Sequence, residues 1–254
     1  MKFIALLLML WIRPLVKSSP SISLLPEAQW ANRAVVALLF AGLAEWLLYA
    51  VSSWAYGLFV LIAQCGALFF LVVRTSPVGF FNRYITEWQR GDYEAGYLHL
   101  VDSGLIKPED IESSEQLNEA AVSEYVLLMF NRLFLPLMFF WLLGVAGLII
   151  AVLVFNVRDR CVETPLWFKR LRHLLFYPLL FSYYLCGHSQ KAWPFLMSSQ
   201  TSDLSLVQCA MQAADSEHAQ HPILAIRTLN ERVLVLWMVL MGVAVILVGV
   251  PGLY

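Results

Sequence analysis

Charged residues are scarce in this 254-residue chain, and they are rare within its longest apolar runs. Asp, Glu, Lys and Arg make up 14% of the residues, whereas hydrophobic residues make up 60%. A soluble domain typically has about 25% charged residues, so this composition argues against an ordinary water-soluble domain. The net charge is −1, and the chain therefore lacks the strongly basic balance of a nucleic-acid-binding protein.

The chain also lacks the short motifs of common enzyme classes. It has no G-x-x-x-x-G-K-[ST] phosphate loop, no H-E-x-x-H zinc motif and no G-x-S-x-G nucleophile turn. The four cysteines are scattered without a C-x-x-C pair, and the five histidines show no metal-ligand spacing, so we expect neither a disulfide nor a bound metal. The sequence leaves the identity of any cofactor unknown. These absences leave enzymatic activity uncertain and favour a protein without catalysis.

What the chain does have is three long apolar runs, at residues 34–73, 126–155 and 233–250. The first is twice the roughly 20 residues that a helix needs to cross a bilayer, so it predicts a hairpin of two helices. The turn of that hairpin and the C-terminal tail contain no Lys or Arg. Most basic residues can therefore share one side of the membrane, which the positive-inside rule makes the cytoplasmic side. These residues are Arg13, Lys17, Arg33, Arg74, Arg83, Arg90, Lys107, Arg158, Arg160, Lys169, Arg170, Arg172, Lys191, Arg227 and Arg232.

We therefore predict an all-α fold, a polytopic membrane helix bundle with amphipathic cytoplasmic helices. The middle run has two interpretations. As a single span it would leave basic residues on both sides of the membrane. As a bent or re-entrant hairpin that breaks near residues 144–147, it keeps every charge on one side, and we favour this hairpin.

The N-terminus resembles a signal peptide, because Lys2 precedes an apolar stretch of about ten residues. However, Arg13 and Pro14 stand where a small-residue cleavage site should follow, so we expect a retained short helix. The predicted segments are 1–33 (short helix and linker), 34–73 (transmembrane hairpin), 74–124 (cytoplasmic helices), 125–156 (second membrane run), 157–232 (cytoplasmic or interfacial helices) and 233–254 (C-terminal transmembrane helix).

The polar segment at residues 74–124 has clear local signals. Apolar residues recur at helical spacing at Phe81, Tyr84, Ile85 and Trp88, which predicts an amphipathic helix. Gly91 is expected to end this helix, and Asp92 to cap the next one. Ser113 with Gln116 matches a capping box and predicts the start of a helix that runs towards the membrane.

A few polar residues interrupt the apolar runs. A charge near the bilayer centre costs about 2.5–3.5 kcal/mol on insertion scales, so Glu45 should have a partner or lie near water. Gln64 on the returning helix is a candidate partner, and the two residues predict a buried polar site.

Asn131 and Arg132 lie near the start of the second apolar run, and Arg132 is four residues before Pro136. Such an arginine is either an interfacial anchor or a ligand for a carboxylate or phosphate.

Several weak motifs follow one another in an order that resembles a known family. They are Tyr84-Ile85-x-x-Trp88-x-Arg90-Gly91-Asp92, Asn131-Arg132-x-Phe134, Phe140-Trp141-Leu142-Leu143-Gly144-x-x-Gly147 and Gly187-His188-x-x-Lys191-Ala192. This order and spacing, together with the hydropathy profile, resemble AmpE, a family of inner-membrane regulatory signalling modulators of Gram-negative bacteria linked to β-lactamase induction. AmpE belongs to the CobD/CbiB superfamily, whose enzymes make an amide bond in cobalamin assembly.

Two departures from these patterns bear on function. Val145 stands where the family's G-P-x-G bend usually has proline. The cobalamin enzymes share an Asp-(aromatic)-(aliphatic)-Pro-x-Arg segment, and the matching residues here are 175–180, where both the carboxylate and the arginine are missing. The resemblance therefore implies a regulator or binding protein rather than a catalyst.

On this interpretation the chain is an inner-membrane regulatory protein that binds an anionic ligand or a protein partner at its cytoplasmic face. Arginines would hold the anionic group, Asp92 would orient one of them, and His188 would be the titratable member. The expected ligand-binding residues are Arg90, Asp92, Asn131, Arg132 and His188. Two alternatives remain: an ATP-dependent amide-forming membrane enzyme, and a transporter or lipid-handling protein.

Overall fold

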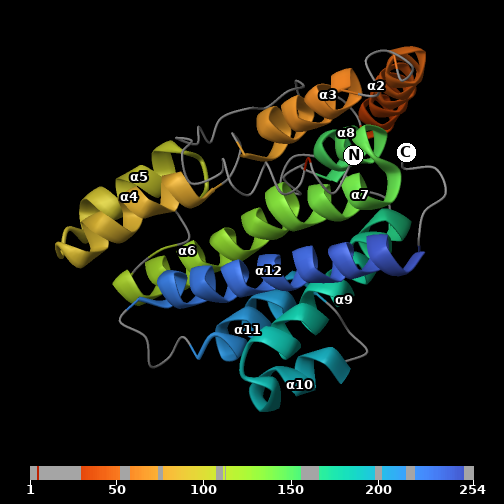
Figure 1. Ribbon diagram of the computed structural model, residues 1–254. Helices are drawn as coiled ribbons and strands as arrows, with labels where there is room; N and C mark the ends of the chain where they lie inside the picture. Colours follow the sequence, from red (N-terminus) through yellow and green to blue (C-terminus); the bar gives the residue numbers. More distant parts are fainter. Residues whose placement is uncertain are drawn as a thin grey trace. The chain divides into compact units, whose positions relative to one another are not determined.

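The computed structural model describes residue 5 and residues 30–51, 58–73, 77–106, 111, 113–155, 166–197, 202–215 and 221–248. These residues form helices joined by turns, with no strand among them, which confirms the all-α class (Figure 1). The expected N-terminal helix, apart from residue 5, and the end of the C-terminal segment lie outside the described residues.

The α-helices are α2 (Trp30–Val51), α3 (Leu58–Leu68), α4 (Val78–Gln89), α5 (Tyr93–Asp102), α6 (Ser114–Met129), α7 (Leu135–Leu143), α8 (Val145–Ile150), α9 (Leu166–Cys186), α10 (Ser189–Met197), α11 (Asp203–Ala213) and α12 (Pro222–Val248). Three short segments are π-helical, namely Phe69–Val73, Phe130–Phe134 and Ala151–Phe155.

The chain divides into two compact units. Unit 1 consists of Met1–Ser76, Asn131–Lys169 and Met238–Tyr254. Unit 2 consists of Pro77–Phe130 and Arg170–Trp237. Each unit is therefore assembled from segments that are distant in the sequence, and each is described by itself below.

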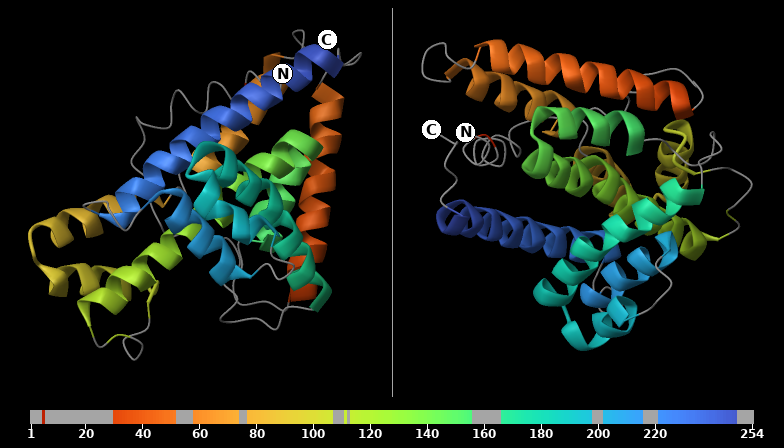
Figure 2. Two further views of the ribbon diagram at one scale, coloured as in Figure 1. Left: turned by 90° about the horizontal axis from the view of Figure 1, so that it is seen from below. Right: turned by 90° about the vertical axis from the view of Figure 1, so that its right-hand side faces the viewer.

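In unit 1 the second apolar run breaks at Gly144, whose φ of 76° lies in the left-handed region. After this break α8 packs against α7 and α2 (Figure 2). Gly147 permits the close approach of α8 to α7: a Cβ atom there would lie 2.7 Å from Cβ of Leu143 and would overlap the carbonyl oxygen of Phe139. The run thus forms a helical hairpin, and its position in a membrane stays a prediction.

One described helix is long and apolar enough to cross a membrane. It is the continuous helix Ser114–Leu143, which comprises α6, the second π-helical segment and α7. Half of its most apolar window is buried within the protein. The other apolar helices in the described ranges are shorter, at Ala34–Ala50, Phe59–Val72 and Val145–Val154.

In unit 2 the local signals of the sequence are matched by the structure. The buried side of α4 contains Phe81, Tyr84 and Ile85, as its helical periodicity predicts. The N-cap of α6 is Ser113, whose side chain accepts a hydrogen bond from the amide of Gln116. The helices of this unit pack in pairs, α4 on α5, α6 on α11 and α10 on α11. Large aromatic side chains such as Tyr125 fill the core of this unit.

Candidate functional site

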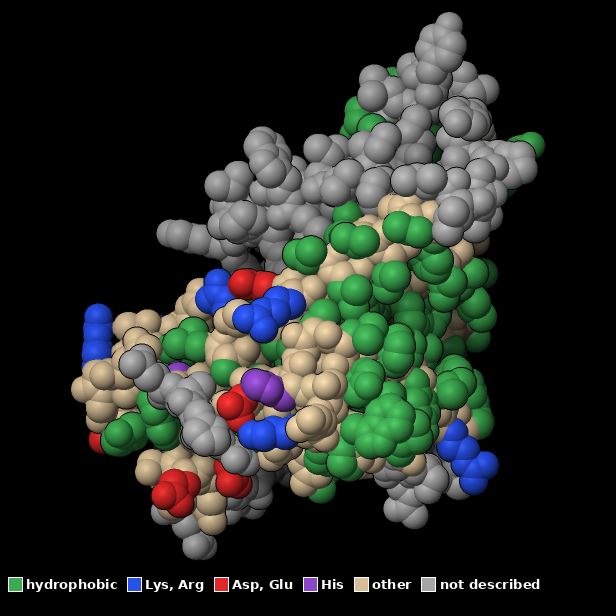
Figure 3. Space-filling model, turned by 60° about the horizontal axis from the view of Figure 1, so that its bottom comes forward, with side chains coloured by type: hydrophobic (Ala, Val, Ile, Leu, Met, Phe, Trp, Pro, Cys, Tyr) green, Lys and Arg blue, Asp and Glu red, His purple; other side chains and the backbone are tan. Residues whose placement is uncertain are grey.

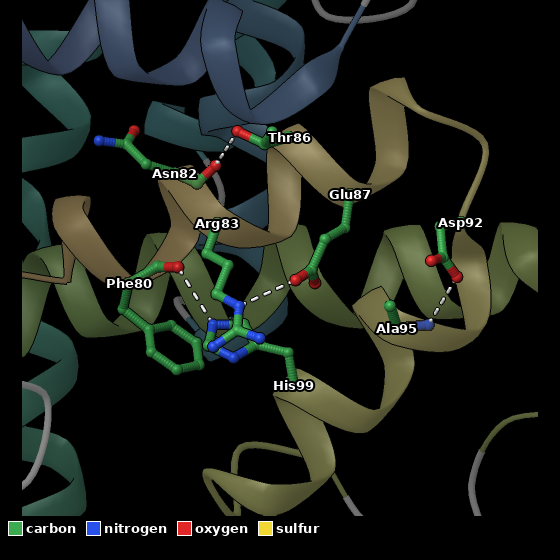
Figure 4. Close-up of polar contacts among 8 residues, drawn as sticks. All are labelled: Phe80, Asn82, Arg83, Thr86, Glu87, Asp92, Ala95 and His99. Carbon is green, nitrogen blue, oxygen red and sulfur yellow. Dashed lines mark hydrogen bonds and ion pairs between the residues drawn. The ribbon is translucent and has the colours of Figure 1, made fainter.

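The α4–α5 turn positions two of the expected ligand-binding residues. Gly91 adopts a φ of 77°, and Asp92 caps α5 by accepting a hydrogen bond of 3.0 Å from the amide of Ala95 (Figure 4). The Asp92 carboxylate therefore has a structural role that accounts for its position. Arg90 ends α4 with an exposed side chain that makes no hydrogen bond or ion pair with another described residue. Its guanidinium is free to bind an anion.

The neighbouring polar side chains of α4 are already partnered. Nε of Arg83 donates to Oε1 of Glu87 at 2.8 Å, which neutralises that arginine (Figure 4). The ring of His99 on α5 stacks on Phe80 at 4.2 Å between centroids, and its Nε2 lies 3.3 Å from the carbonyl oxygen of Phe80. These contacts tie α5 to α4, and they leave Arg90 as the cation best placed to meet a ligand on this hairpin.

Asn131 and Arg132 lie in the π-helical segment Phe130–Phe134, in the middle of the long helix Ser114–Leu143. A π-helical turn widens the helix and occurs frequently at functional sites. The Oδ1 atom of Asn131 is buried and has no hydrogen-bond partner among the described residues. A buried acceptor without a hydrogen bond lowers the free energy of unfolding by about 1–3 kcal/mol. The packing of the helix therefore does not explain the buried amide oxygen of Asn131 in this turn.

His188 lies in a polar cluster at the α9–α10 turn. Its Nε2 is 4.0 Å from Oδ2 of Asp215, and Nζ of Lys191 is 2.5 Å from Oδ1 of the same carboxylate. The turn is held by the amide of His188, which donates to the carbonyl oxygen of Ala213 at 2.9 Å. Gly187 is required there, because a Cβ atom would lie 2.5 Å from that same oxygen. The arrangement places a titratable ring, an ammonium and a carboxylate at one solvent-accessible corner.

The two polar residues of the first apolar run have different surroundings. Gln64 on α3 is buried, and its Oε1 has no hydrogen-bond partner within the described part of the chain. Glu45 on α2 is exposed rather than buried. Its Oε1 accepts a hydrogen bond of 3.2 Å from the amide of Ala146, at the start of α8. Glu45 thus finds its partner in a backbone amide of the second run.

A buried histidine that sequence spacing did not single out lies before α12. His221 is 1% exposed, and its Nδ1 accepts a hydrogen bond from the amide of Ile223 at 3.2 Å. Its ring meets those of Tyr84 and Trp88 edge to face, with both centroid distances at 6.0 Å. Burial lowers the pKa of His221 and favours the neutral ring. Because Nδ1 accepts the hydrogen bond, the ring proton is on Nε2. No local motif indicates this contact, because the α4 residues are far away in the sequence.

Another group that sequence analysis missed is a buried polar pair between α9 and α12. Oη of Tyr183 donates to Oδ1 of Asn230 at 2.8 Å, and both residues are almost completely buried. Burial, followed by the nearby Cys209 and Tyr125, raises the pKa of Tyr183 well above its ordinary value. Burial also raises the pKa of the Cys209 thiol to about 12. These groups stay neutral at physiological pH, so the pair joins helices rather than performing acid–base chemistry.

The expected site residues do not form one described cluster. Arg90 and Asp92 share the α4–α5 turn, whereas His188 lies at the α9–α10 turn, in a different region of unit 2 (Figures 1 and 2). Asn131 and Arg132 belong to unit 1. The structure thus provides two separate polar positions in unit 2 and one in unit 1, each at a helix end or a helix irregularity. No family model, no curated protein and no solved structure matches this chain.

Proposed function

We propose that this chain is an inner-membrane regulatory protein of the AmpE type, associated with β-lactamase induction and cell-wall stress in Gram-negative bacteria. It would cross the membrane several times and keep its polar loops in the cytoplasm. It would bind an anionic ligand, or a partner that presents an anionic group, through Arg132. The order of the motifs quoted above supports the family, and the position of Arg132 supports the binding role.

The observation that carries the binding role is the placement of Arg132 in a π-helical turn. The residue lies in the middle of a helix that is long and apolar enough to cross a membrane. A charge at such a depth costs about 2.5–3.5 kcal/mol and usually marks a functional position. Arginine also matches the geometry of carboxylate and phosphate groups through two parallel hydrogen bonds. A retained arginine in a widened helical turn is therefore suited to hold an anion at that position of the helix.

The multi-pass arrangement is supported by the exposed apolar side chains of α2. Leu39 is 69% exposed and Trp46 is 64% exposed. Exposed apolar side chains of this size are costly in water, at about 25 cal/mol per Å². Contact with lipid removes that cost, and it agrees with the distribution of basic residues in the sequence.

The test is complementation of β-lactamase induction in a strain that lacks the protein. We expect Arg132→Ala to abolish complementation while the protein accumulates normally in the membrane fraction. Arg132→Lys should restore part of it, because lysine retains the charge without the two-pronged geometry. Arg83→Ala is the matched control, since Arg83 is exposed and already paired with Glu87. Wild-type complementation by Arg132→Ala would remove this residue from the site and with it the binding proposal.

A further inference from the structure

An exposed apolar stripe runs along the outer side of α9. Its members are spaced three or four residues apart and comprise Leu171, Leu174, Pro178, Phe181 and Leu185. Leu174 is 60% exposed, and Phe181 and Leu185 are each 50% exposed. The opposite side of the same helix is buried and mostly apolar, with Phe176 and Leu180 fully enclosed. A helix that is apolar on both sides needs a second apolar environment for its outer side.

The stripe continues onto α10 through aromatic contacts. Phe181 stacks near Tyr184 at 6.4 Å, and Tyr184 lies 5.5 Å from Trp193 on α10. Trp193 and Met197 on α10 are both exposed. Figure 3 shows many such hydrophobic side chains on the molecular surface. Tyr and Trp beside an apolar surface are typical of the boundary between lipid and water.

The charge of this region is of one sign. Residues 166–197 contain four basic residues and no Asp or Glu. Arg172 turns inward and pairs with Asp203 at 3.6 Å, and Lys191 pairs with Asp215. Arg170, beside Leu171, is exposed and makes no hydrogen bond or ion pair with another described residue. A free cation at the edge of an apolar stripe complements an anionic lipid surface.

The length and backbone of α9 fit the interface better than the hydrocarbon core. The basic residues occupy its first two turns, and the remaining residues 174–186 would measure about 20 Å, less than the roughly 30 Å of a bilayer core. Pro178 has no amide proton, so the carbonyl of Leu174 lacks its usual helical donor. In hydrocarbon that carbonyl would need a donor from the protein itself, whereas lipid head groups and water at the interface can bond to it.

We infer that α9 and α10 form a lipid-docking surface that lies in the head-group region of the cytoplasmic leaflet. The stripe and the two exposed α10 side chains enter the upper acyl-chain region, and Arg170 binds an anionic phospholipid head group. This inference rests on the membrane location proposed above, but it does not depend on the AmpE resemblance. It assigns a lipid partner to a helix within the segment that the sequence left either cytoplasmic or interfacial.

The experiment places the photocrosslinker p-benzoylphenylalanine at position 174 or 181 of the full chain in nanodiscs of phosphatidylethanolamine and phosphatidylglycerol. Adducts formed on illumination are identified by mass spectrometry. Position 39, which is exposed on α2, is the reference for the membrane location itself. Position 208, which is exposed on α11, is the reference for an aqueous face. We expect lipid adducts at 174 and 181 with yields comparable to that at 39 and well above that at 208.

Each outcome has a separate meaning. One outcome is that position 39 forms lipid adducts, whereas the adduct yields at positions 174 and 181 are no higher than that at position 208. This outcome would overturn the docking surface and leave the membrane location intact. A crosslinked dimer in place of lipid adducts would overturn it in favour of a second copy of the chain. The absence of lipid adducts at every position would overturn the surface and the membrane location together.

Where adducts do form, Arg170→Gln should lower the share of phosphatidylglycerol among them about fivefold, since each basic residue near an anionic surface strengthens binding by about that factor. An unchanged share would remove Arg170 from the surface.

Discussion

The carboxylate of Glu45 accepts a hydrogen bond from the backbone amide of Ala146, a residue 101 positions further along the chain. Ala146 lies in the first turn of α8, directly after the break at Gly144. The amides of a first helical turn have no partner within their own helix. A side chain from α2 therefore caps a helix of the second apolar run, and its negative charge suits the positive end of that helix.

This cap predicts different costs for two substitutions at one position. Glu45→Ala removes the acceptor and should lower the free energy of unfolding by about 1 kcal/mol, as for other lost helix caps. Glu45→Gln retains an oxygen that can accept the same hydrogen bond, and its cost should be smaller. Thermal unfolding of the two variants in one detergent measures the difference. Equal midpoints for Glu45→Ala and the wild type would show that the contact contributes nothing to stability.

The hairpin of the second run predicts opposite effects for two glycine substitutions. Gly147→Ala should destabilise unit 1 by about 1–3 kcal/mol, because the new methyl group overlaps Phe139 and Leu143. Gly66→Ala is the matched control within α3, where nothing lies within 4 Å of the added Cβ atom. That change should stabilise the helix by up to about 1 kcal/mol, since alanine loses less backbone entropy than glycine. Thermal unfolding midpoints should therefore shift in opposite directions.

Local features of the fold could be predicted from the sequence because they depend on a few neighbouring residues. Ser113 with Gln116 predicts a helix start, and the Ser113 side chain accepts a hydrogen bond from that amide. The position of Asp92 after Gly91 predicts a cap for α5, and the structure confirms it. Each signal acts within one helical turn, where side chain and backbone amide meet whatever the rest of the chain does.

Contacts between distant segments could not be predicted in this way. Asp215, the partner of His188 and Lys191, follows them by more than twenty residues and belongs to no motif with them. His221 has no spacing signal, yet it packs against residues of α4. Local sequence patterns do not indicate which helix faces meet, so the nearest charge or ring becomes known only with the tertiary structure. The π-helical turn at Arg132 likewise has no composition signal.

The buried pair of Tyr183 and Asn230 predicts a strong coupling between two substitutions. Tyr183→Phe leaves Oδ1 of Asn230 without its donor, and Asn230→Leu leaves Oη of Tyr183 without its acceptor. Each single change should cost about 1–3 kcal/mol, because a buried polar group then remains unsatisfied. The double variant removes both groups, and its cost should fall well below the sum of the single costs. Additive costs in this double-mutant cycle would show that the two side chains do not interact.

His221 predicts a loss of stability in mild acid. Burial lowers its pKa in the folded protein below the ordinary value of about 6.5. Above that value the ring is neutral in both the folded and the unfolded protein, so it adds no pH dependence. As the pH falls below about 6.5, the unfolded chain binds a proton that the folded protein resists, and the free energy of unfolding falls until the pH passes the folded pKa. Protonation of Nδ1 would also remove the acceptor of the Ile223 amide.

The assignment of this acid response to His221 can be tested with a variant that keeps the helix cap. The substitution His221→Asn offers a side-chain oxygen to the amide of Ile223 but does not titrate, and asparagine is a favoured cap residue. The unfolding midpoint of this variant should change less than that of the wild type between about pH 7.5 and pH 5.5, the range in which an ordinary histidine titrates. His188→Asn is the control, because His188 is exposed and lies in a separate cluster, and this variant should keep the acid response of the wild type. If the His221→Asn variant retained the full response, the buried ring would not be its source.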